Sequence, residues 1–384
     1  MNSFEFTTAG RIIFGAGKLN ELPKQIGQPV AKRVLLVCGY SSDAIPRVRV
    51  MLSESGAAVV EFQVHGEPTV DVIRAGVLAA HNCDVIVALG GGSVLDTGKA
   101  VAALVTNPGD VLDYLEVIGK GLPLLHVPLP YIAIPTTAGT GAEATRNAVI
   151  ESPEQNVKVS LRSPAMLPRV ALVDPELTYN LPPHVTASSG LDALTQLIEP
   201  FVSVKANPMT DAICREGLSH AAQSLLRAYE NGTDKEARKG MALASLFGGL
   251  ALANAALGAV HGFAGPLGGM LHAPHGAVCA RLLPLVMEAN IQALEARQPE
   301  HPAIERYVEI AQILTGDKNA AALDGLEWVR HLVSLLKIPP LSAYGMSKAD
   351  FSAAVEKTMK ANSYKGNPIE LNEKELMTIL EKSI

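Results

Sequence analysis

Four residues in the middle of the chain have the types and the spacing of a divalent-metal site. Asp192 and Gln196 lie four residues apart, so on a helix they share one face. His261 and His275 flank a segment broken by glycine and proline, which can fold both imidazoles back to one point. A carboxylate and two imidazoles suit a borderline ion such as iron(II) or zinc. We therefore expect these four residues to surround a metal ion.

Each member of this set also has an ordinary structural explanation. Taken alone, Asp192 reads as a helix cap or a surface charge, and His261 as a hydrogen-bonded core histidine. The combination is more specific than its parts. Gln196 is the weakest member because a neutral amide oxygen is a poorer ligand than imidazole, which predicts a lowered metal affinity.

A glycine run provides the second chemical feature. Gly90, Gly91 and Gly92, followed by Ser93, join a buried strand to a helix. Glycines let the backbone approach a phosphate closely, and the helix N-terminus offers unpaired N–H groups. The G-x-G-x-x-G spacing is absent, so an ordinary tight turn is an equal alternative. Asp96, six residues after Gly90, either contacts the ligand or pairs with the lysine three residues later on the helix surface.

A second loop carries hydroxyl groups at the end of another predicted strand. Thr136, Thr137 and Thr140 lie with two glycines in the segment 135–141. Such a loop suits contacts to ribose or pyrophosphate oxygens, and a helix-capping loop is the alternative. Two such loops at strand ends raise the probability that each one binds a nucleotide.

Strands and helices alternate in the first half of the chain, which predicts an α/β domain with a doubly wound sheet. The segment 3–14 reads as a strand or hairpin. Buried strands are expected at 33–38, 57–64, 84–89, 131–134 and 170–173, helices at 44–56, 69–82 and from Ser93 to about 105, and short strands around Lys158.

The second half has helical periodicity and almost no strand pattern. Helices are expected at 185–203, 208–229, 234–259, 276–297, 302–314, 319–336, 347–360 and 372–382. We therefore expect a dinucleotide-binding α/β domain over 1–180 and an all-α metal and substrate domain over 181–384.

Composition narrows the class of protein. The chain has 384 residues, 48% of them hydrophobic and 18% charged, with a net charge of −6. This suits a compact globule and argues against a nucleic-acid surface, which needs clustered Lys and Arg. The sequence shows neither a membrane span nor a signal peptide, so a cytoplasmic location is expected. The four cysteines form no C-x-x-C pair and are expected to be buried small hydrophobes.

As a set, these motifs resemble the iron-containing (group III) alcohol dehydrogenase family, whose fold is dehydroquinate synthase-like. The resemblance extends over nearly the whole chain and rests on Gly10–Lys18, Gly90–Lys99, Ile134–Thr145, Val173–Pro175, Leu181–Pro183, Gly190–Glu199 and His261–Gly276. It implies NAD(P)-linked hydride transfer to or from a small alcohol or aldehyde, in a cleft between the two domains, with iron or zinc as the metal. Family members are often dimers that pair through the N-terminal strand, so a homodimer through residues 3–7 is implied.

The resemblance also implies roles for individual residues. Gly91, Gly92 and Ser93 would hold the cofactor pyrophosphate, and the three threonines would line the rest of the nucleotide site. Asp192, His261 and His275 would bind the metal. We also assign Asp96, Asn147 and Lys158 to the surroundings of the cofactor.

Three positions depart from the family pattern. The family usually has a histidine where this chain has Gln196. Many members have a histidine, often given a proton-relay role, where this chain has Gly265; His272 is then the nearby candidate for the relay. Members that prefer NAD often end a strand with an aspartate where this chain has Gly39. The absence of an acid there, with Ser41 close by, favours NADP(H) and leaves NAD(H) open.

Two other functions remain open at this stage. A sugar-phosphate cyclase of the same fold needs several Lys and Arg residues around its substrate, and the segment 261–276 has none. A nucleotide-binding protein that has lost its metal is suggested by Gln196 and Gly265. The intact Asp192, His261 and His275 argue against that loss.

Overall fold

The computed structural model describes residues 3–27, 31–39, 42–155 and 157–384. Their contacts divide into two compact units. The N-terminal unit contains residues 7–137 and 141–180, and the C-terminal unit contains residues 3–6, 138–140 and 181–384, as far as they are described. Ser41, one of the expected cofactor residues, lies outside the described residues.

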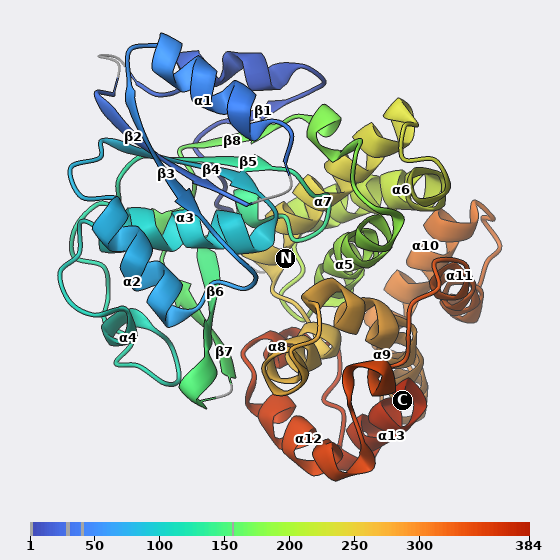
Figure 1. The fold of residues 1–384 in the computed structure, drawn as a ribbon. Helices are drawn as coiled ribbons and strands as arrows, with labels where there is room; N and C mark the ends of the chain where they lie inside the picture. The colour runs from blue at the N-terminus through green and yellow to red at the C-terminus, as the bar shows by residue number, and fades with distance from the viewer. Residues whose placement is uncertain (1–2, 28–30, 40–41, 156) are drawn as a thin grey trace. The chain divides into compact units, whose positions relative to one another are not determined.

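A parallel sheet of six strands forms the centre of the N-terminal unit (Figure 1). Its order is β1-β8-β5-β4-β2-β3, and each neighbouring pair is parallel. The strands are β1 Ile12–Phe14, β2 Arg33–Cys38, β3 Ala58–Gln63, β4 Val85–Gly90, β5 Tyr131–Pro135 and β8 Val170–Val173. The predicted parallel α/β fold is therefore confirmed.

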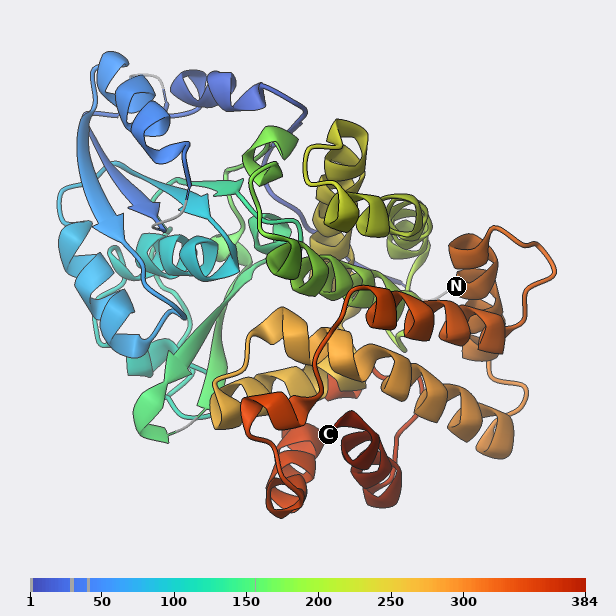
Figure 2. The same cartoon turned by 45° about the vertical axis from the view of Figure 1, so that its right-hand side comes forward.

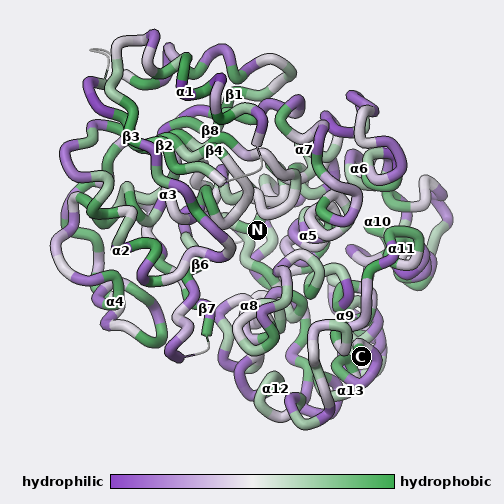
Figure 3. Tube along the Cα trace, viewed as in Figure 1, coloured by the Kyte–Doolittle hydropathy of each residue, from purple (hydrophilic) through white to green (hydrophobic). Residues whose placement is uncertain are grey.

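Helices cover both faces of this sheet because its inner strands β2, β4, β5 and β8 consist mostly of buried apolar residues. Figure 3 shows the chain coloured by hydropathy, with apolar residues in green. Val34 and Leu36 of β2 pack in the same cluster as Val48 of α1, whereas Leu35 and Val37 pack on the opposite face with residues of α3. The helices of this unit are α1 Ile45–Glu54, α2 Val70–Ala79, α3 Gly92–Leu104 and α4 Val111–Tyr114, with short 3-10 helices at Lys18–Lys24, Ala142–Ala144, Pro153–Gln155, Pro164–Met166 and Pro175–Thr178.

The short strands expected around Lys158 form an antiparallel pair, β6 Asn147–Ser152 and β7 Val157–Arg162. The prediction of a strand or hairpin over 3–14 was wrong for most of its length. Only β1 is a strand, and it pairs with β8. The described part of the chain supplies no strand to pair with residues 3–11, and an extended segment becomes a strand only through such a partner.

The C-terminal unit is helical, as predicted. Its helices are α5 Pro183–Val202, α6 Pro208–Glu230, α7 Lys235–Ala255, α8 Ala259–Leu271, α9 His275–Arg297, α10 Ala303–Thr315, α11 Ala322–Leu335, α12 Phe351–Lys360 and α13 Glu373–Ser383, with 3-10 turns at Leu341–Tyr344, Lys348–Asp350 and Ser363–Gly366. Helix α5 packs against α6, α7 and α9 (Figure 2). Its second half is buried continuously from Gly190 to Val202. Polar side chains in this half of α5 are therefore held away from bulk water.

One helix in this unit was not predicted. The segment after His261 is rich in glycine and contains Pro266, yet it forms α8. Close packing favours the helix: a Cβ at Gly262 would lie only 3.1 Å from the Cβ of Tyr364. The chain reverses later, where His272 has a φ of 50° and Pro274 precedes α9. That turn returns His275 toward His261.

Among the described helices, α9 is long and apolar enough to cross a membrane, and the bent pair α7 and α8 passes the same test jointly. Of the apolar window in α9, 72% is buried inside the protein. Burial of this extent is typical of a core helix in a globular protein.

Candidate metal centre

Helix α5 presents three polar side chains at one place. Asp192, Gln196 and Glu199 follow one another at intervals of four and three residues, which puts them on one helical face. Their exposed fractions are only 1%, 2% and 5%. Burying two carboxylates is unfavourable unless positive or hydrogen-bonding groups compensate them.

Helices α8 and α9 bring two imidazoles to the same place. His261 lies in the first turn of α8 and His275 begins α9, and their ring centroids are 5.4 Å apart. The Nε2 atoms of His261 and His275 lie 3.4 and 3.7 Å from Oδ1 of Asp192. The structure thus brings together the three residues with the strongest expected metal-binding character.

A fourth donor atom lies beside them. The Sγ atom of Cys279 is 3.8 Å from Nε2 of His261 and 3.6 Å from Nε2 of His275. One donor atom each from Asp192, His261, His275 and Cys279 lie within 4.8 Å of one another. All four cysteines are buried, as predicted. Cys279 was nevertheless not among the predicted ligands, although its spacing of four from His275 on a helix was the available signal.

Two buried oxygens support a cation at this place. Oδ1 of Asp192 and Oε1 of Gln196 are buried and have no hydrogen-bond partner. Leaving a buried acceptor unsatisfied costs about 1–3 kcal/mol, more for a charged group. The Gln196 amide donates from Nε2 to the carbonyl of Gly139 at 3.3 Å, so its nitrogen is already engaged. The donor set of carboxylate, imidazoles and sulfur fits a divalent metal of the zinc or iron(II) type.

The charges around the imidazoles also favour a cation. Burial lowers the pKa of His275, but Cys279 and Asp192 outweigh burial and raise that pKa to about 9. Burial raises the pKa of Asp192, but His275 and His261 outweigh it and hold that pKa below its usual value. Protons and metal ions therefore compete for the same negative surroundings, because an imidazole must lose its proton to bind a metal.

Glu199 fixes the orientation of His261. Its Oε2 atom lies 2.7 Å from Nδ1 of His261, and its Oε1 atom accepts a hydrogen bond from the backbone N–H of Val260 at 2.7 Å. With Nδ1 donating to this carboxylate, Nε2 is the nitrogen that faces Asp192 and Cys279. Glu199 was not predicted to have a role, although its place three residues after Gln196 on α5 was the available signal.

The glycine loop and the first residues of the threonine loop, Thr136 and Thr137, lie side by side in the N-terminal unit. Gly91 precedes α3, and Gly92 is its first residue. The backbone N–H of Thr136 donates to the carbonyl of Gly90 at 2.9 Å, and a Cβ on Gly91 would lie 3.4 Å from Thr137. A strand end, a glycine loop and a helix N-terminus therefore meet as the sequence predicted. Ser93 lies in the first turn of α3, whereas Thr140 belongs to the C-terminal unit.

Asp96 pairs with Lys99, but not on the surface as the structural alternative assumed. Lys99 is 1% exposed, and its Nζ lies 3.4 Å from Oδ1 of Asp96. Lys99 also donates to Thr145 Oγ1 and to the carbonyls of Ala142 and Asn147 at 2.7–2.8 Å. The other oxygen of Asp96 accepts from Val149 N–H at 2.9 Å. This buried pair links α3 to β6.

The remaining expected residues occupy separate places. Lys158 pairs with Glu67 at 3.4 Å. Gly39 follows β2, where a Cβ would lie 3.5 Å from Val94. His272 is exposed at the C-terminal cap of α8, in the left-handed conformation.

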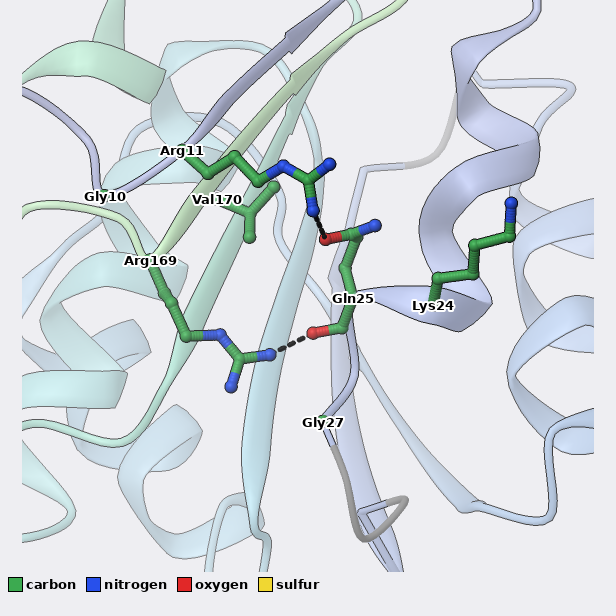
Figure 4. Close-up of a pocket in the computed structure, with 7 residues that line it drawn as sticks. All are labelled: Gly10, Arg11, Lys24, Gln25, Gly27, Arg169 and Val170. Atoms are coloured by element: carbon green, nitrogen blue, oxygen red, sulfur yellow. Dashed lines mark hydrogen bonds between the residues drawn. The ribbon is translucent and has the colours of Figure 1, made fainter.

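A pocket of about 360 Å³ on the N-terminal unit contains none of the expected site residues (Figure 4). Arg11 donates to Oε1 of Gln25 at 3.3 Å, and Arg169 donates to the backbone carbonyl of the same residue. Both arginines thus hold the end of the 3-10 helix Lys18–Lys24 against β1 and β8. The polar residues that line the pocket therefore have a structural role, and no ligand is needed to explain them.

Comparison with known proteins matches both halves of the chain. A family model described as iron-containing alcohol dehydrogenase matches residues 9–175. A second, described as the C-terminal part of the Fe-containing alcohol dehydrogenase family, matches residues 186–384. Alcohol dehydrogenase 4 of Saccharomyces cerevisiae (strain YJM789) is 36% identical over 377 residues, which cover 96% of each chain.

Solved structures agree over the full length. A 1,3-propanediol oxidoreductase has a TM-score of 0.92 at 32% identity, with 100% of both chains covered. A sulfoacetaldehyde reductase from Bifidobacterium kashiwanohense, solved in complex with NAD+, has a TM-score of 0.87 at 26% identity, covering 100% of this chain and 99% of its own.

Proposed function

Because the chain belongs to the iron-containing alcohol dehydrogenase family, we propose that it transfers hydride between a nicotinamide cofactor and a small alcohol or aldehyde. The observation that carries this proposal for the chain itself is the convergence of Asp192, His261 and His275, whose donor atoms lie within 4.8 Å of one another. A family member that had lost its metal would have no need to keep this buried set.

Asp192, His261 and His275 are the proposed metal ligands. A bound iron(II) or zinc ion would supply Lewis acidity to the substrate oxygen. Glu199 holds the His261 ring so that Nε2 faces the site, and the burial of α5 excludes water from the carboxylate. These residues thus hold the donor atoms in place before any substrate arrives.

The glycine loop and α3 form the proposed cofactor site. Gly91, Gly92 and Ser93 supply backbone N–H groups at a helix N-terminus, which suits a pyrophosphate. Thr136, Thr137 and Thr140 supply hydroxyls for the remaining nucleotide oxygens. Because Gly39 offers no carboxylate to repel a 2′-phosphate, we propose that NADP(H) is accepted as well as NAD(H).

A water molecule or His272 is proposed to carry the proton. A Cβ at Gly265 would meet nothing within 4 Å, so the place of the usual relay histidine is open space that suits water. His272 is exposed at the turn before α9, three residues from His275. Its exposure allows proton exchange with solvent.

We further propose that the functional domains are 1–180 and 181–384, that two copies pair through residues 3–7, and that the enzyme works in the cytoplasm. The division of contacts near residue 180 supports the domain bounds. Exposure of Phe4, at 44%, supports a partner for the N-terminal segment.

A substrate screen tests the proposed function. The purified protein is stripped with a chelator, reloaded with zinc or with iron(II) without oxygen, and mixed with short-chain aldehydes and NADH or NADPH. A parallel assay contains a sugar phosphate and NAD+. We expect aldehyde-dependent cofactor oxidation that requires the metal. Cofactor binding with no turnover under any metal would support a metal-free nucleotide-binding protein, and turnover of a sugar phosphate without net cofactor oxidation would support a cyclase.

A further inference from the structure

Cys279 adds a fourth donor atom to the cluster formed by Asp192, His261 and His275. Its Sγ atom lies 3.8 Å from Nε2 of His261 and 3.6 Å from Nε2 of His275. We propose that the Cys279 thiolate is a metal ligand of this enzyme and that it replaces the neutral Gln196 amide, a weak donor, as the fourth ligand. A thiolate in that position makes the site prefer zinc over iron(II). This inference rests on the proposed function, because it concerns the same metal.

The distances between donor atoms match those of a tetrahedral ion. With Zn–S of about 2.3 Å and Zn–N or Zn–O of about 2.0 Å, sulfur and nitrogen would be about 3.6 Å apart, and nitrogen and oxygen about 3.3 Å. The observed S–N separations are 3.8 and 3.6 Å, and the observed O–N separations are 3.4 and 3.7 Å. The four side chains need only small shifts to share one ion.

The alternative is that Cys279 is a buried small hydrophobe. Helix α9 does pack in the hydrophobic core, and Cys279 is fully buried there. Its sulfur, however, faces two imidazole nitrogens rather than apolar carbon alone. Because Nδ1 of His261 is committed to Glu199, the lone pair that a metal ion would use lies on Nε2, the nitrogen that faces the sulfur, once the ring has given up its second proton. The four donor atoms therefore suit a cation between them.

Gln196 explains why a further ligand is required. Its Oε1 atom is buried without a hydrogen-bond partner, and its Nε2 atom is held by the Gly139 carbonyl. An amide oxygen carries no charge, so it neither neutralises the ion nor competes with a thiolate for it. A thiolate is a soft, negatively charged donor that favours zinc. The Cys279 thiolate thus compensates for the imidazole that family members usually have at the position of Gln196.

Cobalt(II) is the spectroscopic probe for this ligand. The stripped protein is loaded with cobalt(II), and the thiolate-to-cobalt charge-transfer band in the near ultraviolet is recorded for the wild type, Cys279→Ala and the control Cys214→Ala. Cys214 is also fully buried in the C-terminal unit but belongs to no metal cluster among the described residues. We expect the band in the wild type and in Cys214→Ala, and its loss in Cys279→Ala.

A competition experiment tests the metal preference. Zinc and iron(II) affinities are measured against a chelator for the same three proteins, with circular dichroism to verify folding. Cys279→Ala should weaken zinc binding at least about tenfold, because even the loss of a partner behind a ligand costs about 10- to 100-fold in metal affinity. Iron(II) binding should weaken less, because iron(II) gains less than zinc from a soft thiolate donor. Adding Gln196→His to Cys279→Ala should restore affinity and shift the preference toward iron(II).

Two results would overturn the proposal. One is a cobalt-loaded wild type that turns over aldehyde but shows no thiolate band, which rejects Cys279 as a ligand and leaves the proposed function standing. The other is a folded Cys279→Ala protein with unchanged zinc affinity. A wild type that binds no metal would reject both the inference and the metal-dependent function.

Discussion

The Glu199 carboxylate and the His261 imidazole form a buried hydrogen bond, with 2.7 Å between Oε2 and Nδ1. Both residues are less than a tenth exposed. Because Glu199 also accepts from the Val260 backbone, it fixes the first turn of α8 as well as the ring. A carboxylate behind a metal-binding histidine raises the basicity of the nitrogen that faces the ion.

Replacing this carboxylate should weaken the metal site without unfolding the unit. For Glu199→Gln we expect metal affinity about 10- to 100-fold lower, since the amide neither carries the charge nor sets the His261 tautomer as strongly. Competition with a chelator measures the affinity. Glu305→Gln, on the exposed side of α10, is the control. Unchanged affinity in Glu199→Gln would mean that His261 needs no support from α5.

Glu143 should make stability depend on pH. Burial raises the pKa of its carboxyl to about 7, above the usual value of 4.5. Because the folded state disfavours the ionised carboxylate, ionisation of Glu143 lowers the free energy of unfolding. This loss is small below about pH 4.5, grows as the pH rises and levels off above about pH 7. Glu143→Gln should therefore gain roughly 3 kcal/mol over the wild type at pH 8 and little at pH 4.5.

Denaturant unfolding of the two proteins at pH 4.5 and pH 8 measures this difference. A gain for Glu143→Gln of the same size at both pH values would show that the glutamine improves packing and that ionisation is not responsible.

Lys99 should be required for the fold of the N-terminal unit. Lys99→Met leaves the Asp96 carboxylate buried beside no cation, and we expect a loss of about 3–5 kcal/mol in the free energy of unfolding. The double variant with Asp96→Asn should recover part of that loss. A single variant as stable as the wild type would contradict the role of this pair in joining α3 to β6.

Gly39 should control the choice between the two nicotinamide cofactors. An acidic side chain at the end of β2 repels a 2′-phosphate, so Gly39→Asp should lower kcat/KM for NADPH at least about tenfold relative to NADH. A Cβ at this position would meet Val94 at an ordinary distance of 3.5 Å, so the substitution should be tolerated. Gly39→Asn is the neutral control, and an equal effect of both variants would point to shape instead of charge.

Local patterns in the sequence predicted most of the fold. Continuous apolar runs such as Val34–Cys38 and Val85–Leu89 become central strands because both faces of the sheet are covered. Glycine and proline misled the prediction at α8, where packing of Gly262 against Tyr364 outweighs weak helix propensity. The candidate site shows the same contrast between what local sequence predicts and what packing decides. Residue type alone pointed to Asp192, His261 and His275 as candidate ligands, whereas the places of Cys279, Glu199 and Lys99 depend on which elements meet.

The most direct test of the central claim is a metal titration of the chelator-stripped enzyme. The rate of aldehyde-dependent NAD(P)H oxidation is followed as zinc or iron(II) is added to the wild type and to Asp192→Asn, with bound metal counted in parallel. We expect the rate of the wild type to rise until one ion is bound per chain, and we expect Asp192→Asn neither to retain the ion nor to gain activity. A stripped wild type that is fully active, or an Asp192→Asn protein that responds like the wild type, would contradict this claim.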